Sequence, residues 1–431
     1  MSTADDLEAQ LTRIVFEPPR WLAPCIAVTG AITAGFFAAL LYVFVTGIGT
    51  LGNDIPVAWA FPITNFVWWI GIGHAGTFIS AFLLLLEQKW RSSINRFAEA
   101  MTLFALLQAG LFPILHLGRP WFAYWLVPYP STMRVWPQFR SSLTWDIVAV
   151  STYFTISLLF WYLGLVPDLA VMRDRAPTRG KRIAYGIFAL GWRGSARTWQ
   201  RHRIVYGVLA GIATPLVVSV HSIVSMDFAI GLVPGWHSEI FPPYFVAGAI
   251  FSGFALVITL MIPARALYKL HNVVTKRHLD MMARMLLVTS LIVAYSYFAE
   301  TLATQRGHDV FEKHQLFYTR ARGPFAWAFW LTIVCNVVLP QTLWLARART
   351  SATYLFILSI FIQIGMWTER FLIICGSLSA DFLPSAWGRF RPSFLDGFIL
   401  FGSCGFFLFA FFLFLRFVPF IPIREVQADA S

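Results

Sequence analysis

The sequence alternates between long apolar stretches and shorter polar segments. A helix needs about 20 predominantly apolar residues to cross a bilayer. On that criterion we predict an all-α integral membrane protein with ten transmembrane helices. Their approximate extents are 22–47, 57–87, 97–117, 143–164, 204–222, 244–264, 285–302, 324–346, 352–374 and 395–417.

The order of these helices permits an internal duplication. Helices two to five and helices six to nine would cross the membrane in the same directions, as in parallel repeats of a four-helix bundle. Two four-helix bundles flanked by helices one and ten are therefore possible, although the sequence support for a duplication is thin, and the family resemblance described at the end of this section implies the same arrangement. The corresponding divisions are 1–56, 57–222, 223–374 and 375–431, and the first bundle holds the candidate site.

Composition supports the membrane assignment. Hydrophobic residues make up 58% of the chain and charged residues only 13%, whereas about 25% is usual in soluble proteins. The termini and alternate loops hold 23 Lys and Arg, with Arg416 counted at the C-terminal end, against nine in the other five loops. This asymmetry predicts cytoplasmic termini and accounts for the net charge of +12 without nucleic acid as a partner.

The four cysteines are scattered and form no C-x-x-C or C-x-x-C-H unit. We therefore expect no iron–sulfur cluster, no covalent haem and no other metal in this chain. The first 20 residues are polar, and the apolar run after them lacks a small-residue cleavage signature. The first span is predicted to be retained.

Two loops have unusual compositions. Residues 180–193 set an apolar patch between arginines, which is typical of a helix lying in the membrane interface, although a solvated basic loop fits equally well. The outer loop 118–142 suits an aromatic cap or a docking surface. Its aromatic residues include Trp121, Tyr124, Trp125, Tyr129 and Trp136.

Candidate site residues gather at the predicted outer ends of the helices. His116 and Arg119 end the third span, and Asp146 lies in the first turn of the fourth. Each has an ordinary explanation: His116 as an interfacial histidine, Asp146 near a positive helix end, and Arg119 reaching headgroups. Their convergence at one depth favours proton transfer to and from an apolar ligand. Groups on the same side include His221, Asp227, Glu300, Glu369 and Arg370.

Quinol oxidation would require such residues, because each hydroxyl loses a proton as the electrons leave. A histidine can accept one proton, and a partly buried carboxylate can orient the imidazole or take the other. The residue types fit this chemistry without identifying the ligand. His74, in the middle of the second span among small residues, is either a packed histidine or part of a proton path towards Glu99 and Glu87.

Two other functions fit the same sequence. A solute transporter would bind its substrate near the membrane midplane, often at broken helices. A b-type cytochrome would use His116 and His221 as axial haem ligands. The clustering of ionisable groups towards one face argues against the transporter.

Several motifs resemble the NrfD-like family of polysulfide reductase membrane subunits, and most closely the larger quinone-binding NrfD-type subunit of bacterial alternative complex III. The resemblance covers nearly the whole chain. The matching motifs are 68–77 (WWIGIGHAGT), 90–91 with 93–96, Phe112-Pro113, His116, 118–121 (GRPW), Trp136-Pro137, Trp145-Asp146, 185–195, His221 with Asp227, and 234–237 followed by 241–245.

The resemblance implies a quinol:cytochrome c or quinol:oxidase oxidoreductase of the bacterial inner membrane. Menaquinol or ubiquinol would bind near the periplasmic face at His116 and Asp146, with Arg119 nearby. Expected partners are membrane lipid, an iron–sulfur subunit, c-type cytochromes, a second NrfD-type subunit and a terminal oxidase. Proton translocation is proposed for such subunits, and the candidate residues here are His74, Glu99, His221 and Asp227.

Overall fold

The computed structural model describes residues 4–126 and 141–430, and within these ranges the regular structure is entirely helical. The α-helices are α1 (Ala4–Phe16), α2 (Leu22–Thr46), α3 (Phe61–Leu85), α4 (Asn95–His116), α5 (Ser142–Asp174), α6 (Arg179–Phe188), α7 (Ala196–Ala229), α8 (Phe241–Leu267), α9 (Lys276–Arg306), α10 (Val310–Lys313), α11 (Ala326–Ile333), α12 (Ala346–Thr350), α13 (Ala352–Phe371), α14 (Phe394–Phe417) and α15 (Ile423–Ala430).

The prediction of ten spans is confirmed. Ten helical segments in the described chain are long and apolar enough to cross a membrane, and each coincides with one predicted span. The eighth span continues from α11 through the short helical segments Val334–Val338 and Leu339–Trp344, and the ninth extends α13 to Gly376. Together with the family match reported below, these spans identify a multi-pass membrane protein.

The predicted ends of several helices are wrong. The loop predicted at 165–203 is much shorter, because α5 continues to Asp174 and α7 begins at Ala196. At its other end α7 continues to Ala229, seven residues beyond the predicted end of that span. Hydropathy marks only the part of a helix that lies in hydrocarbon, whereas backbone hydrogen bonding continues through the polar residues beyond it.

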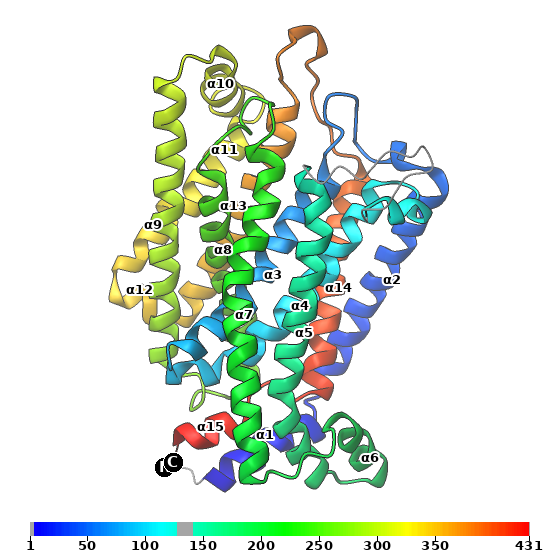
Figure 1. Cartoon of the computed structure of the whole chain (residues 1–431), viewed down its shortest axis with the longest axis vertical. Coiled ribbons are helices and arrows are strands. Elements are labelled where there is room, and N and C mark those ends of the chain that lie inside the picture. The colour runs from blue at the N-terminus through cyan, green and yellow to red at the C-terminus, as the bar shows by residue number, and fades with distance from the viewer. Residues whose placement is uncertain (1–3, 127–140, 431) are drawn as a thin grey trace.

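The long helices run roughly side by side along the long axis of the molecule (Figure 1). Helices α1, α6 and α15 lie at one end together with both chain termini, and α10 lies at the other end. We call these ends the termini face and the opposite face. The location of the termini face in the cytoplasm remains a prediction.

Helices α3 and α8 lie at the centre, with most of their residues buried. Small residues permit close packing there: a Cβ on Gly76 would lie 2.0 Å from the carbonyl oxygen of Ala98, and one on Gly253 would lie 1.8 Å from the Cβ of Ala75. Helix α3 packs against α4, α7 and α8, α5 packs against α7, and α8 packs against α9 and α13.

We call α3, α4, α5 and α7 the N-terminal helix group, and α8, α9, α11 and α13 the C-terminal helix group. Since α3 packs along α8 as well as along its own group, helix contacts alone do not separate two bundles. The two-bundle division and its boundaries remain predictions.

The aromatic loop is described only in part. Trp121 and Tyr124 have exposed side chains on the opposite face. Residues 127–140, which include Tyr129, Trp136 and Pro137 of the predicted cap, lie outside the described ranges.

Candidate functional site

Two carboxyl groups meet at the opposite face. Asp146 lies in the first turn of α5, and Asp227 lies in the last turn of α7 rather than in the loop predicted there. Their side chains are in hydrogen-bonding contact, and the side chain of Ser142 also contacts Asp227. The Oδ1 atom of each carboxyl is buried and has no hydrogen-bond partner among the described residues. Two carboxyl groups in contact can hold a proton between them.

His116 ends α4 at the same face of the molecule. Its side chain is half-buried, and its Nδ1 atom is buried without a hydrogen-bond partner in the described part of the chain. The imidazole lies edge-on to Trp59, with ring centroids 6.5 Å apart. Trp59 also packs against Phe228, the residue after Asp227, at 6.2 Å. Thus Trp59 connects His116 to the end of α7.

The sequence left open which members of this cluster touch one another. Among hydrogen bonds between described residues, none joins His116 to Asp146, and none joins Arg119 to either of them. The Arg119 side chain is exposed, three residues beyond the end of α4. Asp146 and Asp227 were both candidate residues, but the contact between them was not predicted from the sequence.

A histidine pair lies deeper in the N-terminal helix group. The Nδ1 atoms of His74 and His221 are 2.8 Å apart, and neither side chain is exposed to solvent. A hydrogen bond between two ring nitrogens needs one donor and one acceptor, so at least one of the imidazoles is neutral in this arrangement. Both Nε2 atoms are buried without a partner in the described chain.

The depth of His221 corrects the sequence analysis. The predicted span placed it at the outer edge, but α7 continues eight residues further, which is about 12 Å at 1.5 Å per residue. The sequence pattern predicted that the ionisable groups gather towards one face. The structure instead places some of them, including His221, deep inside the N-terminal helix group. For His74, the interpretation as a histidine bonded to a backbone carbonyl of a neighbouring helix is replaced by this side-chain contact with α7.

Hydroxyl groups surround the histidine pair on the side of the termini face. The hydroxyl of Tyr153 donates to the backbone carbonyl of His74 at 2.8 Å, and the two rings pack at 4.4 Å. Hydroxyls of Thr77, Thr102 and Ser157 lie within hydrogen-bonding reach of the same tyrosine. These groups occupy the level between the histidines and the next buried acid.

That acid is Glu99, near the beginning of α4. Its Oε1 atom accepts hydrogen bonds from Ser80 Oγ at 2.5 Å and from the Tyr206 hydroxyl at 3.1 Å. Only 1% of the residue is exposed, and Oε2 has no partner among the described residues. Nearby, Arg96 pairs with Asp168 at 3.0 Å inside the protein. Glu99 is thus buried without a direct ion pair.

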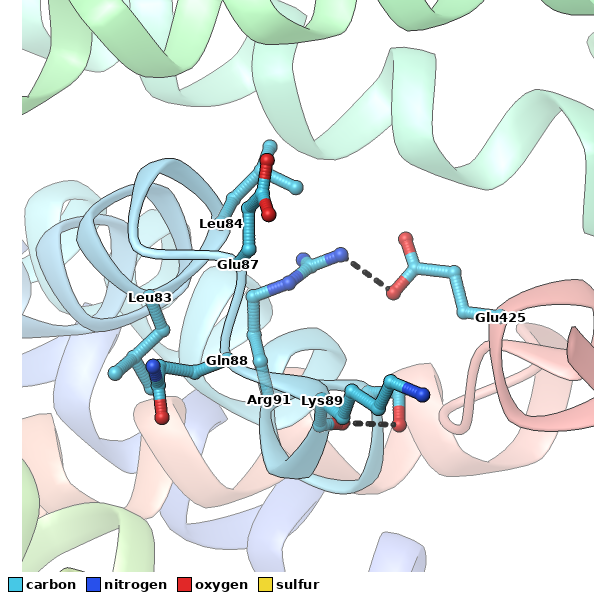
Figure 2. Close-up of a pocket in the computed structure, with 8 residues that line it drawn as sticks. Leu83, Leu84, Glu87, Gln88, Lys89, Arg91 and Glu425 are labelled. Carbon is cyan, nitrogen blue, oxygen red and sulfur yellow. Dashed lines mark hydrogen bonds and ion pairs between the residues drawn. The ribbon is translucent and has the colours of Figure 1, made fainter. Parts of the chain in front are cut away.

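A cavity of about 240 Å³ opens beside this region on the termini face. Figure 2 shows the guanidinium group of Arg91 directed towards the carboxylate of Glu425 on α15, at 2.7 Å, with Glu87 also on the cavity wall. Arg91 interacts electrostatically with Glu99 and Tyr206 as well. It therefore lies between the cavity and the buried acid.

The C-terminal helix group buries its acids differently. Glu369 pairs with Arg370 at 3.0 Å and accepts a short hydrogen bond from Tyr297. The Arg370 guanidinium also lies 3.9 Å from the ring centroid of Phe245. Glu300 faces Arg320 at 3.3 Å, next to a cavity of about 680 Å³ on the opposite face.

The described residues contain no group of three or more His, Cys, Asp or Glu side chains that could hold a metal ion. All four cysteines are free thiols. The expectation that this chain holds no metal or haem remains a prediction. His221, one of the two histidines considered as axial haem ligands, has its Nδ1 atom against His74.

The motifs that carried the resemblance can now be compared with known proteins. Residues 49–380 match the family described as "NrfD: Polysulphide reductase, NrfD". A protein of Halobacterium salinarum, named as a membrane subunit of dimethyl sulfoxide reductase, is 26% identical over 56% of this chain. The aligned region spans 54% of that relative, so only about half of its length is covered.

A second relative, the "Hdr-like menaquinol oxidoreductase integral membrane subunit" of Archaeoglobus fulgidus, is 23% identical over 73% of this chain and 69% of its own length. The family match includes every helix of both helix groups, together with Asp146, Asp227 and the histidine pair. The chain therefore belongs to the NrfD family of polysulphide reductase membrane proteins.

Proposed function

We propose that this chain is the quinol-binding and quinol-oxidising membrane subunit of a respiratory oxidoreductase. The observation that carries the proposal is the contact between Asp146 and Asp227 at the same face as His116, where three buried polar atoms have no partner among the described residues. Buried ionisable groups in a membrane protein are costly and are commonly retained for function. The named menaquinol oxidoreductase subunit among the relatives supports the same class of ligand.

The chemistry assigns separate tasks to the residues. A quinol becomes a quinone by losing two electrons and two protons. His116 accepts a proton from one hydroxyl through its unpartnered Nδ1 atom, and the Asp146–Asp227 pair accepts the other. Arg119, exposed just beyond the end of α4, is assigned to quinol binding rather than to proton transfer. Trp59 supplies an aromatic wall against which an apolar ring can pack.

The electrons leave through partners. We infer that an iron–sulfur subunit docks on the opposite face and accepts them, in a complex of the alternative complex III type. Its remaining members would be c-type cytochromes, a second NrfD-type subunit and, in some assemblies, a terminal oxidase. The complex would lie in a bacterial inner membrane, with this chain's termini in the cytoplasm and the quinol protons released on the other side.

A proton path across the N-terminal helix group forms the second part of the proposal. From the opposite face, the groups in order are Asp227, the His221–His74 pair, the hydroxyls around Tyr153, and Glu99. Asp227 lies six positions after His221 on α7, and Ser80 lies six positions after His74 on α3. Each gap is therefore about 9 Å along a helix. Water can bridge gaps of this size where polar atoms lack partners.

Such a path would allow redox energy to move charge. One elementary charge crossing the membrane corresponds to about 2.3 kcal/mol per 100 mV. The cavity beside Arg91 and Glu425 gives solvent an approach to the Glu99 end of the path (Figure 2).

The test uses the complex purified with its partner subunits and follows quinol-driven reduction of its own redox centres. We expect His116→Ala to slow reduction by about 100-fold or more, the usual contribution of a positioned acid or base. His237→Ala is the matched control, since His237 is an exposed histidine on the same face but in the loop before α8. Native gels establish equal assembly of both variants.

The outcome separates two roles for His116. If quinol-driven reduction is slow in His116→Ala and normal in His237→Ala, the result supports a quinol site at the end of α4. If both variants reduce their redox centres at the wild-type rate, His116 is structural and the assignment of the site is wrong.

A further inference from the structure

The termini face carries an amphipathic helix held rigidly against the membrane-spanning body. The hydroxyl of Tyr185 in α6 donates to the backbone carbonyl of Phe417, the last residue of α14, at 2.9 Å. The carbonyl of Phe188, the last residue of α6, accepts from the hydroxyl of Tyr162 in α5 at 2.8 Å. These contacts fix α6 at the level where the apolar part of a spanning helix ends.

The connection after α6 is anchored as well. Arg173 of α5 donates to the carbonyl of Trp192 at 3.0 Å, and Ala189 is fully buried. Leu190, with φ of +49°, and Gly191, with φ of +68°, take the left-handed backbone conformation. The turn after α6 is therefore a defined structure with its own contacts, unlike the solvated basic loop that the sequence also permitted.

One face of α6 is apolar and uncovered. Ile183 and Ile187, one turn apart, have 53% and 66% of their surface exposed, and Phe188 and Leu190 have 57% and 69%. The remaining face packs on the protein, where Lys181 lies 5.3 Å above the ring of Phe16. No described residue of the chain covers the exposed apolar face.

Positive charge surrounds this face. Residues 173–203 contain nine Lys and Arg and one acid, Asp174, which already pairs with Arg173 at 2.8 Å. Arg179 and Arg182 of α6 are exposed, as is Arg193 after it. An apolar helix face flanked by arginines, at the end of a spanning bundle, matches the boundary between acyl chains and anionic headgroups.

We propose that α6 and the turn after it form a binding site for anionic phospholipid of the adjoining leaflet. The side chains of Ile183, Ile187 and Phe188 lie among acyl chains. Arg179 and Arg182 bind the phosphate groups. Because this site lies on the termini face, it is independent of the quinol site proposed at the other end of the molecule (Figure 1).

The test compares lipid binding to the delipidated full chain, purified with any subunits that accompany it. Phosphatidylglycerol and phosphatidylcholine are titrated separately, and bound lipid is counted by native mass spectrometry. One arginine near an anionic surface contributes about 1 kcal/mol, or a factor of about five. The double variant Arg179→Gln with Arg182→Gln should therefore bind phosphatidylglycerol about 25-fold more weakly, with phosphatidylcholine binding unchanged.

Two further variants identify the occupant. Arg389→Gln with Arg391→Gln removes two exposed arginines from the opposite face and should leave the preference for phosphatidylglycerol within two-fold of wild type. Ile187→Ser with Phe188→Ser should weaken the binding of both lipids. All of these changes lie on the surface, and unaltered thermal unfolding verifies that the variants are folded.

Three results would overturn the proposal. The wild-type protein could show no preference for phosphatidylglycerol, or the control pair could lose as much binding as the α6 pair. Loss of an accompanying subunit from the α6 variant, without a change in lipid binding, would show that the face is covered by protein.

Discussion

The two helix groups bury ionisable side chains in different ways. In the C-terminal helix group, the buried acids Glu369 and Glu300 each face an arginine, at 3.0 and 3.3 Å. The N-terminal helix group has one such pair, Arg96 with Asp168 at 3.0 Å, but also two buried acids without a direct ion pair. Asp146 contacts another carboxyl, and Glu99 accepts hydrogen bonds from hydroxyl groups. The buried ionisable groups of the N-terminal helix group also extend from one face of the protein to the other.

This difference separates structure from chemistry. A buried ion pair neutralises its own charge, so its removal mainly affects folding. A buried acid without a cation can take up or release a proton at much lower cost to its surroundings, which suits it to catalysis or proton transfer. The comparison therefore predicts that substitutions at the unpaired acids of the N-terminal helix group reduce turnover, whereas substitutions at the ion pairs of the C-terminal helix group reduce stability.

The largest expected effect follows from breaking the carboxyl pair. Asp146→Asn and Asp227→Asn should each reduce quinol oxidation by about 10²- to 10⁴-fold, because the amide keeps the shape of the side chain but cannot accept the quinol proton. The double variant should be little slower than either single variant, since the two carboxyls act as a unit. Steady-state quinol oxidation by the assembled complex measures all three rates.

Asp280→Asn is the matched control for these substitutions. Asp280 is an aspartate of α9 that pairs with Arg349 at 2.7 Å on the termini face. It should leave the rate within about two-fold of wild type. Wild-type rates in both carboxyl-pair variants would end the assignment of the pair to catalysis.

Breaking the Glu369–Arg370 pair should affect folding instead. Arg370→Gln leaves the Glu369 carboxylate buried without its cation and removes the guanidinium from the ring of Phe245, at an expected cost of about 3 kcal/mol. The free energy of unfolding in detergent measures this loss. Quinol oxidation per folded complex should stay near wild type, and a 100-fold loss in that rate would remove the distinction between the two helix groups.

The sequence was sufficient to predict the helices but not how they meet. Ten spans follow from hydropathy, because an apolar helix of sufficient length has few alternatives to crossing the bilayer. Helix ends do not follow, since α7 continues through Ser222 to Ala229 and carries His221 inward relative to the predicted end. The depth assigned to a residue changes by about 1.5 Å for each residue of error in a helix end.

Side-chain pairing depends on the rotation of each helix, which packing determines. The contact of Gly253 with Ala75 fixes α8 against α3 close to His74, and no periodicity in the sequence specifies it. For the same reason the sequence placed His116 and Asp146 at one depth but left their contact open, and the carboxyl that touches Asp146 belongs to Asp227. The motifs with small residues around His74 were the best available signal of a close helix contact.

A smaller effect should follow from Glu99→Gln. Because Glu99 lies far from the quinol end, about 25 Å along α4 from His116, the substitution should leave quinol oxidation intact when no membrane potential is present. If the proton path is correct, charge movement per quinol in proteoliposomes should fall about 100-fold, the lower end of the usual contribution of one positioned proton carrier. Potential-sensitive dyes measure it.

The control for this measurement is Glu17→Gln, which changes an exposed acid of the termini face that pairs with Arg13 and lies outside the proposed path. Charge movement should be nearly unaffected by it. Equal charge movement in wild type and the Glu99 variant would mean that Glu99 only stabilises the packing of Ser80 and Tyr206.

The smallest expected effect concerns Glu312 of α10, outside the spanning helices. Both of its carboxylate oxygens accept from the backbone N–H of Gly235 at 2.9 Å. Burial raises the pKa of Glu312, while that N–H and Arg320 act in the opposite direction, and Asp309 and His237 lie near it. A folded-state pKa above the unfolded value means that the folded protein binds the proton more tightly, so stability falls as the pH rises through that range.

Glu312→Gln should therefore flatten the fall in melting temperature as the pH rises above the ordinary glutamate range, and the change should be small because the side chain is only partly buried. Quinol oxidation should not change, because this acid lies on α10, outside the N-terminal helix group. A parallel pH profile in wild type and variant would show that Glu312 does not contribute to the pH dependence. If Glu312→Gln reduced turnover, an acid outside the N-terminal helix group would affect quinol oxidation. That result would contradict the proposal that turnover depends on the unpaired acids of the N-terminal helix group.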